Sequence, residues 1–393
     1  MRHWLTRLLK GETVLVIAAV IALVSCIFVH PDGQYLGYIH VNTITQLGSL
    51  MVVVCGFQRI GVFHAIGANL LARVHSVRGL ALVLVSLTFF ASMFITNDVA
   101  LVTFVPFAMA VLIMAGLEKH VFLVVTLMTL GANVGSMLTP IGNAHNLYLK
   151  ARSDMPTGEF LLLMAPYTLV AALMLVLVCW FAFGRQRVDQ LEGMKAKDIQ
   201  HSVLAPKPDG IQPQVEEMQD SGRWRIVVYL LLFLVCLLGV ARVIPQAAMV
   251  LVVILVFLIC DRRVFLHVDW GLLLTFVAFF IFIGNARRMP QFYGMVSGLV
   301  NIHPLIASIL CSQVISNVPT SLLVSGFSTA WKAIILGTNL GGMGTLIASM
   351  ASLVSYKAVV KRYPHKKGHY LKVYTLFNLL FLIVLTGLAL IME

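Results

Sequence analysis

Two stretches of the chain repeat one pattern of glycine and polar residues inside long apolar segments. They cover residues 131–141 and 337–347, and both read Gly-x-Asn-x-Gly-x-Met-x-Thr-x-Ile. Asn and Thr side chains carry oxygen atoms that suit a small cation, and glycine allows a ligand to approach the backbone closely. A duplicated pair of interrupted hydrophobic segments is the best sequence indication of a secondary transporter's binding site.

An asparagine-centred motif precedes each copy of this pattern. Thr96, Asn97 and Asp98 stand before the first copy, and Ser316 and Asn317 stand before the second. Each motif interrupts an apolar run, so we expect one helix to end and another to begin at a tip there. The free carbonyl groups of the ending helix suit Na⁺, and the free N–H groups of the beginning helix suit an anion.

Together the four motifs predict one transport site. We expect the substrate to be bound by the side chains of Asn97, Asn133, Thr139, Asn143, Asn317, Thr320, Asn339 and Thr345. We assign coupling to a cation or a proton to Thr96, Asn97, Asp98, Ser316 and Asn317. Na⁺ is expected near Thr96, Asn97, Asp98 and Gly135, and near Ser316, Asn317 and Gly341, with no other cofactor. Small and hydroxyl residues in membrane helices also serve packing alone, but two matched pairs of motifs favour a site.

Asp98 is the one acidic residue deep within these four motif-bearing segments. A carboxylate at membrane depth is costly and indicates function, here Na⁺ binding or proton transfer. The alternative is a structural carboxylate that caps the start of its own helix. The second tip carries Val318 at the matching position, so the two tips differ chemically. His145 is a further candidate proton carrier or anion ligand, or a structural histidine.

The composition indicates a polytopic α-helical membrane protein. Of 393 residues, 60% are hydrophobic and 11% are charged, and apolar runs long enough to cross a bilayer recur along the chain. The formal net charge of +12 is typical of basic cytoplasmic loops, and we expect no nucleic-acid partner. The six cysteines are scattered without a CxxC pair, which indicates small core residues rather than disulfides or metal ligands.

The apolar segments predict an all-α protein built from two repeats. Membrane helices are expected at 12–29, 43–57, 121–149, 160–183, 225–243, 247–260, 265–286, 332–360 and 371–391. The segments 81–116 and 304–328 are predicted to be re-entrant helical hairpins, and 121–149 and 332–360 to be broken helices. The first repeat would cover 1–183, a polar cytoplasmic linker 184–224, a connecting helix 225–246 and the second repeat 247–393. The apolar run near the N-terminus is predicted to be a retained helix rather than a cleaved signal.

The distribution of Lys and Arg predicts the orientation in the membrane. With the N-terminus in the cytoplasm and the C-terminus outside, most basic loop residues face the cytoplasm, as the positive-inside rule requires. The basic residues left outside are then Lys150, Arg152, Arg242, Arg287, Arg288 and Lys332. The two hairpins then open on opposite sides, so the repeats are predicted to be inverted, as alternating access requires.

These residues resemble the ion transporter superfamily. It includes divalent-anion/sodium symporters, citrate transporter-like proteins, arsenite permeases and a group of sodium/proton antiporters. Thr96-Asn97-Asp98 and Ser316-Asn317-Val318 correspond to the family's paired Ser-Asn-Thr signatures, although neither copy is strict. The Asn-Asp tip followed by Thr103-Phe104-Val105-Pro106 is similar to the arsenite-permease and citrate-transporter-like branch. The resemblance covers most of the chain outside the linker. It implies an elevator mechanism in a homodimer, where a scaffold holds a moving domain of hairpins and broken helices.

The sequence therefore predicts a secondary active transporter in an inner or plasma membrane, in contact with lipid, and not an enzyme. Its substrate would be a small anion or carboxylate of the citrate, dicarboxylate or inorganic oxyanion class, coupled to Na⁺ or H⁺. The alternatives are an Na⁺/H⁺ antiporter, with Asp98 exchanging the two ions, and an arsenite-type metalloid exporter. An intramembrane enzyme or a scaffold is disfavoured because no HExxH, no GxSxG and no paired deep carboxylates occur.

Overall fold

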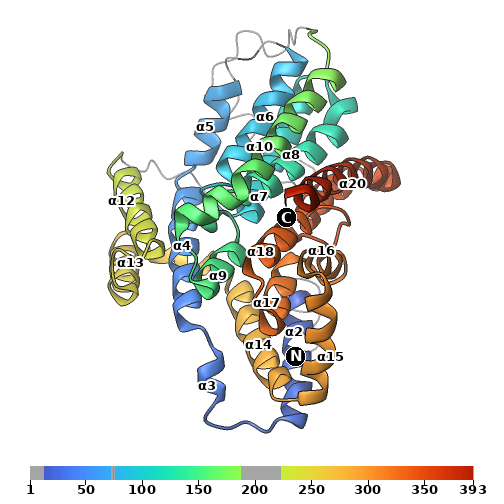
Figure 1. Ribbon diagram of the computed structural model, residues 1–393. Helices are drawn as coiled ribbons and strands as arrows, with labels where there is room; N and C mark the ends of the chain where they lie inside the picture. The colour runs from blue at the N-terminus through green and yellow to red at the C-terminus, as the bar shows by residue number, and fades with distance from the viewer. Residues whose placement is uncertain (1–12, 72–73, 75, 187–222, 393) are drawn as a thin grey trace.

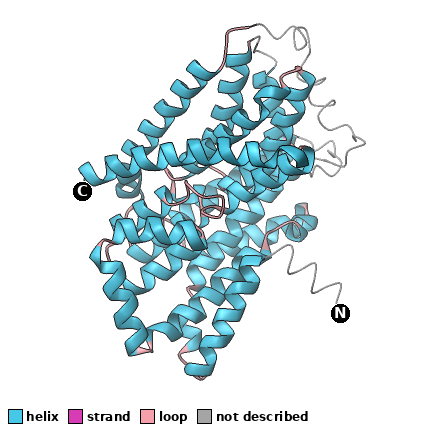
Figure 2. Ribbon diagram, turned by 90° about the vertical axis from the view of Figure 1, so that its right-hand side faces the viewer, coloured by secondary structure: helices cyan, strands magenta, loops and turns pink. Residues whose placement is uncertain are grey.

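The structure is a computed structural model that describes residues 13–71, 74, 76–186 and 223–392. Within these ranges the chain forms helices joined by turns, with no strand (Figure 2). The expectation of an all-α polytopic membrane protein is confirmed by these helices and by their apolar character. The predicted linker at 184–224 lies almost wholly outside the described residues and stays a prediction.

The first half of the chain contributes nine helices within the described ranges. They are α2 (Thr13–Phe28), α3 (Tyr35–Tyr38), α4 (Val41–Arg59), α5 (Val62–Leu71), α6 (Val77–Ala91), α7 (Asn97–Met114), α8 (Val121–Ser136), α9 (Ala144–Ser153) and α10 (Thr157–Ala182). Two short 3₁₀ turns accompany them, η1 (Glu118–His120) and η2 (Pro140–Gly142). The second of these turns interrupts the path from α8 to α9.

The second half also contributes nine helices within the described ranges. They are α12 (Arg223–Val240), α13 (Gln246–Cys260), α14 (Trp270–Arg287), α15 (Pro290–Ile302), α16 (Pro304–Ile315), α17 (Asn317–Phe327), α18 (Trp331–Leu340), α19 (Met350–Arg362) and α20 (Lys367–Met392). The 3₁₀ turns are η4 (Arg262–Leu266) and η5 (Pro364–Lys366). An irregular stretch separates α18 from α19, as one separates α8 from α9.

Several helices are long and apolar enough to cross a bilayer. Five qualify on their own among the described residues, namely α4, α7, α10, α14 and α20 with its preceding turn. The two longest, α10 and α20, have 26 residues each. They expose large apolar side chains such as Leu162, Phe181 and Ile391, which suit contact with lipid tails.

Besides the four-residue α3, two helices were missed by the sequence prediction, α5 and α15. They have 10 and 13 residues, too few for a membrane span, and each stands directly before the helix that leads to a tip. The axis turns by 111° between α15 and α16, where His303 alone separates the two helices. Proline at the start of α16 disfavours helical geometry in the residue before it, which explains a sharp turn there.

Different helices gather at the two ends of the molecule. In Figure 1, α5, α6 and α8 lie in the upper part, whereas α14, α15 and α17 lie in the lower part. α12 and α13 stand at one side, and α20 extends to the other. Figure 2 shows irregular segments midway along the molecule, surrounded by helices.

The two copies of the glycine motif pack in matching ways. A Cβ added to Gly135 of α8 would clash with the Phe89 carbonyl and lie 2.6 Å from the hydroxyl oxygen of Ser92. A Cβ added to Gly341, the matching glycine after α18, would lie 2.7 Å from the hydroxyl oxygen of Ser312. Ser92 and Ser312 each stand five residues before the tip asparagine of their half. Glycines at matching positions of the two halves therefore allow the corresponding helices to pack closely.

The correspondence continues in the preceding turn of the broken helices. A Cβ on Gly131 would lie 3.2 Å from the carbonyl oxygen of Val85, and one on Gly337 would lie 2.6 Å from that of Leu305. Val85 and Leu305 each stand twelve residues before a tip asparagine. The packing of α6 on α8 is thus repeated by α16 on α18.

We predict that Gly135→Ala lowers the stability of the protein, because the added methyl group meets backbone atoms that cannot rotate away. Overpacking of this kind costs about 1–3 kcal/mol. The matched control is Gly158→Ala at the start of α10, where a Cβ would meet nothing within 4 Å. Thermal unfolding in detergent should show a lower melting temperature for the first variant only. Equal melting temperatures would contradict the close packing of α6 on α8.

Candidate functional site

The first tip is the irregular segment between the end of α6 and the start of α7. Asn97, the first residue of α7, is buried, and its Nδ2 donates to Oδ1 of Asn133 at 3.0 Å. Its own Oδ1 accepts the backbone N–H of Asp98 at 3.0 Å. The side chain of Asn97 is therefore held at both ends. Its amide nitrogen bonds α8, and its amide oxygen bonds the backbone of the next residue.

The second tip is the single residue Ser316 between α16 and α17. Its φ is +74° with ψ 155°, a conformation in which residues other than glycine are strained by about 1–3 kcal/mol. The backbone N–H of Asn317 donates to the carbonyl of Ala348 at 2.9 Å, which ties this tip to the break between α18 and α19. The strained turn is thus held in place by that break.

Both tips meet at this one break, which covers residues 341–349. Nδ2 of Asn133 donates to the carbonyl of Gly342 at 3.4 Å, and the hydroxyl of Ser349 donates to Oδ1 of Asn133 at 3.3 Å. Gly342 also lies against the side chain of Asn317, since an added Cβ would be 2.8 Å from its Nδ2. The structure therefore brings together Asn97, Asn133 and Asn317, as the sequence predicted they would converge.

A second amide pair joins the two halves nearby. Nδ2 of Asn339 donates to Oδ1 of Asn146 at 2.6 Å. Asn146 in turn donates to the carbonyl groups of Ser136 at 3.3 Å and Thr139 at 3.4 Å. It satisfies carbonyls that the end of α8 leaves without helical partners. Asn146 is not one of the eight residues expected to bind the substrate. The sequence signal for its role is its place as a polar residue in an apolar segment, just after a helix break.

Thr139 and Thr345 make matching bonds to residues just before the tip asparagines. The hydroxyl of Thr139 donates to the carbonyl of Met93 at 2.5 Å, and that of Thr345 donates to the carbonyl of Gln313 at 2.9 Å. Met93 and Gln313 each stand four residues before a tip asparagine. These threonines hold each break against its own tip, and Thr345 lies at an exposed position rather than inside the amide cluster.

Gln313 is a residue that the sequence prediction missed. Its Nε2 donates to the carbonyls of Gly341 at 2.9 Å and Met343 at 2.8 Å, and its Oε1 accepts the N–H of Thr345 at 2.8 Å. One amide side chain thus satisfies three backbone groups of the break. The sequence signal for this role was a polar glutamine at the position where the first half has Met93.

Three more predicted or candidate residues are buried close to the breaks. Asn143 lies in extended backbone just before α9 and is 5% exposed. The hydroxyl of Thr320 and both ring nitrogens of His145 are buried, with no hydrogen-bond partner among the described residues. An unsatisfied buried polar group costs about 1–3 kcal/mol, so these atoms are suited to a ligand or water.

A cavity of about 390 Å³ reaches the first tip from one side. Thr96 and Asp98 line it, and one carboxylate oxygen of Asp98 is buried without a hydrogen-bond partner among the described residues. Gln58 of α4, Asp269 before α14 and Lys357 of α19 line the same cavity. Asp269 and Lys357 are exposed, so the cavity opens beside them. In the sequence both resemble ordinary charged residues near helix ends, and their position facing Asp98 was not predicted.

The two tips differ in their electrostatics. Asp98 in the first turn of α7 places a negative charge where the helix dipole favours one. In the first turn of α17 the N–H of Asn317 is already bonded to Ala348 and Pro319 has none. The second tip therefore offers fewer free donors to an anion than the sequence suggested. The first tip is the better place for a cation.

The donors gathered here are amide, hydroxyl, carboxylate and backbone oxygens. Such oxygen ligands suit hard cations, the class to which Na⁺ belongs. Over the described ranges no group of three or more His, Cys, Asp or Glu side chains lies close enough together to hold a metal ion. The groups of this region thus have the chemistry that hard ions and hydrogen-bonding oxyanions require.

Comparison with known proteins agrees with this chemistry. The family described as Citrate transporter matches residues 4–331. The chain is 29% identical to the inner membrane protein YbiR of Escherichia coli over 320 residues, which cover 80% of this chain and 79% of that protein. It is 28% identical to the uncharacterized transporter MJ0456 of Methanocaldococcus jannaschii over 354 residues, 88% of this chain and 89% of that protein. An uncharacterized transporter of Mycobacterium tuberculosis, Rv2684, is 24% identical over 381 residues.

We predict that Asn97 and Asn133 stabilise the fold jointly. In a double-mutant cycle the variants Asn97→Ala, Asn133→Ala and their combination should be non-additive, because either single change breaks the same bond. The coupling expected for a polar pair between membrane helices is about 0.6 kcal/mol, and a larger loss is expected for Asn133→Ala since it also bonds Gly342 and Ser349. Thermal or chemical unfolding measures the cycle. Strict additivity would mean that the pair is not bonded in the folded protein.

Proposed function

This chain belongs to the citrate transporter family and is a membrane transporter, and we propose that it is a secondary active transporter of a small anion. The proposed substrates are citrate, dicarboxylates or inorganic oxyanions, with Na⁺ or H⁺ as the coupling ion. The proposed location is an inner or plasma membrane, with the N-terminus in the cytoplasm and the C-terminus outside.

The observation that carries this proposal is the meeting of both tips at one break. Asn97 reaches residues 341–349 through Asn133, and Asn317 reaches them directly. Amides from both halves therefore surround a single region. In the proposal the substrate sits among these groups, where Asn97, Asn133 and Asn317 supply N–H donors to its oxygens, while both N–H groups of Asn339 already donate to Asn146 and to the Ile335 carbonyl.

Asp98 provides a physical reason for coupling. A substrate anion at about 6 Å from an ionised Asp98 would be repelled by about 3 kcal/mol at an effective dielectric constant of 20. Na⁺ bound near Thr96, Asn97, Asp98 and the Gly135 backbone, or a proton on Asp98, removes this repulsion. A second Na⁺ is proposed near Ser316, Asn317 and Gly341. The cation would then be bound first and the anion second.

We propose that the motif-bearing helices move as a unit relative to the other helices. The helices α6–α9 and α16–α19 would move together against a scaffold that includes α4 and α12–α14. The Asp98 cavity supports this division, because it lies between α4 and the start of α14 on one side and α7, α9 and α19 on the other. The matched glycine packing supports two repeats. Their inversion is proposed from the distribution of Lys and Arg, the re-entrant hairpins from the interrupted apolar segments, and the homodimer from the family resemblance.

A second candidate function is Na⁺/H⁺ antiport. It is favoured by the buried carboxylate oxygen of Asp98 that lacks a hydrogen-bond partner among the described residues and lines a cavity shared with Asp269. In that case Asp98 would exchange the two ions and no anion would be carried.

Ligand-dependent thermal stability distinguishes the two candidates. A ligand that binds the folded protein raises its melting temperature by mass action. We expect an anion such as citrate to raise it, and to raise it further in the presence of Na⁺ or at the pH that favours protonation. If Na⁺ raises the melting temperature in a pH-dependent way and no anion tested changes it, antiport replaces the anion proposal.

We predict that Asp98→Asn abolishes the dependence of transport on the cation gradient while the protein still folds. The substitution keeps the shape of the side chain and removes the charge that binds Na⁺ or H⁺. Uptake by proteoliposomes with and without an imposed Na⁺ or pH gradient measures it. The control is Asp32→Asn, an acidic residue outside the site that pairs with Arg288 at 2.8 Å. Gradient-driven uptake equal to wild type in Asp98→Asn would remove Asp98 from coupling.

We also predict that Asn97→Ala and Asn317→Ala each reduce transport at least about tenfold, the effect of losing roughly 1.4 kcal/mol of binding. Both are expected to matter because both tips contribute to one site. Asn301→Ala is the matched control, since Asn301 lies exposed on α15 and bonds only carbonyls of its own half. If one tip variant transports normally, the site is not shared between the tips.

A further inference from the structure

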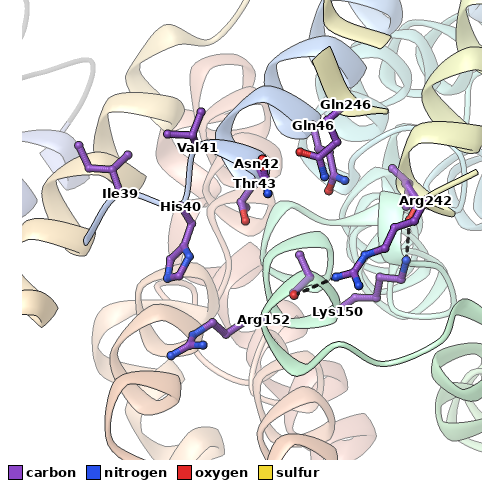
Figure 3. Close-up of a pocket in the computed structure, with 12 residues that line it drawn as sticks. Ile39, His40, Val41, Asn42, Thr43, Gln46, Lys150, Arg152, Arg242 and Gln246 are labelled. Carbon is purple, nitrogen blue, oxygen red and sulfur yellow. Dashed lines mark hydrogen bonds between the residues drawn. The ribbon is translucent and has the colours of Figure 1, made fainter. Parts of the chain in front are cut away.

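A second cavity, of about 670 Å³, lies beside the end of α9 (Figure 3). Its walls come from the start of α4, the end of α9 and the turn between α12 and α13. Figure 3 shows His40 and Arg152 at one end of it and Lys150 and Arg242 at the other. Among the described residues that line it, none carries a carboxylate.

Lys150 is the most unusual residue in this wall. It is only 6% exposed, and its ammonium group donates to the carbonyl of Val240 at 2.6 Å, at the last residue of α12. Burying a charge without a counter-charge is costly. The carbonyl end of a helix offsets part of that cost but does not neutralise the lysine. A buried ammonium group beside a polar cavity is therefore suited to an anion.

The other basic groups differ in how far they are already paired. Arg242 forms an ion pair with Asp154 and donates to the Ala151 carbonyl at 3.4 Å, so its charge is largely balanced. Arg152 has its guanidinium 5.9 Å from the centre of the Trp331 ring and is partly buried. Burial, and then the nearby Arg152 and Arg287, lower the pKa of His40 and so favour its neutral form. Lys150 and Arg152 thus supply positive charge that no ion pair among the described residues takes up.

The basic cavity lies along the same two helices as the Asp98 cavity, α4 and α9. The Asp98 cavity is lined by α4 from Leu47 onward and by Ala144 and Leu147 of α9. The basic cavity is lined by α4 up to Gln46 and by the next turn of α9, at Lys150 and beyond. Tyr148, between these two stretches of α9, bonds Ser325 of α17, the helix that begins at the second tip, at 2.8 Å. The basic cavity therefore stands next to the transport site rather than apart from it.

We propose that this cavity is an anion-binding vestibule in which Lys150 and Arg152 hold a small multivalent anion before it reaches the transport site. The inference rests on the proposed function, because it gives the transported anion a second place to bind. Polar amides of Asn42, Gln46 and Gln246 complete the wall. A site of one charge sign raises the local concentration of the opposite ion and its rate of association by about 10- to 1,000-fold, with strong dependence on salt.

The test measures KM for citrate from each side of the membrane, in right-side-out and inside-out vesicles. Arg152→Gln is expected to raise KM about tenfold from the one side on which the cavity opens, to leave kcat unchanged and to weaken the salt dependence of KM. Lys150→Gln is expected to do the same more strongly. Arg288→Gln is the control, a cation paired with Asp32 outside the cavity. Wild-type KM and salt dependence in both vestibule variants would overturn the proposal.

A binding measurement separates this proposal from the transport proposal. Citrate is titrated calorimetrically into Asn317→Ala, whose transport site is impaired by design, with and without Arg152→Gln and Lys150→Gln added. Each variant must show cooperative unfolding first, and if Lys150→Gln does not fold, Arg152→Gln alone decides. Heat that is lost in the vestibule variants supports the vestibule even if the protein transports no citrate. No heat in Asn317→Ala, or heat unaffected by the vestibule variants, overturns it.

Discussion

The structure depends on one constraint, that a helix interrupted among apolar side chains must have its free backbone groups satisfied by other parts of the protein. Here the partners are mostly amides and hydroxyls from neighbouring segments. Gln313 satisfies three groups of the break at 341–349, and Asn146 satisfies two carbonyls near the end of α8. The polar cluster at the centre exists because the helices break there. The groups that could bind an ion are the same ones that hold the breaks together.

The two halves share their packing and differ in their chemistry. Gly135 and Gly341 contact residues that stand the same number of positions before the tip asparagines in the sequence. The same holds for the residues that Thr139 and Thr345 bond. Duplication of packing needs only that small residues recur at fixed spacing. The charged side chain is free to differ, and only the first tip has a carboxylate, Asp98. Two similar backbone frames with one carboxylate would suit the proposed site, with a cation near Asp98 and an anion near the amides.

Much of this arrangement could be predicted from the sequence, because glycine, proline and asparagine inside apolar runs mark breaks by a local rule. The convergence of Asn97, Asn133 and Asn317 followed from the repeat alone. The short helices α5 and α15 could not be predicted, since neither spans a membrane nor carries a distinctive pattern. Gln313, Asp269 and Lys357 were missed for another reason. Their roles depend on which segments face one another, and residue type carries no such information. The burial of Lys150 was missed likewise, because α9 continues to Ser153 beyond the expected helix end.

The ends of α9 are held unequally, and this bears on how a transport site can open to one side at a time. Near its start the helix lines the cavity that reaches Asp98 and opens beside Asp269 and Lys357. At its end Lys150 bonds α12, and Arg242, in the turn after α12, pairs with Asp154. Any displacement of α9 along α12 has to break both polar contacts. An anion that takes over the charge of Lys150 would weaken one of them, and the proposed binding in the basic cavity would then be energetically linked to movement of α9.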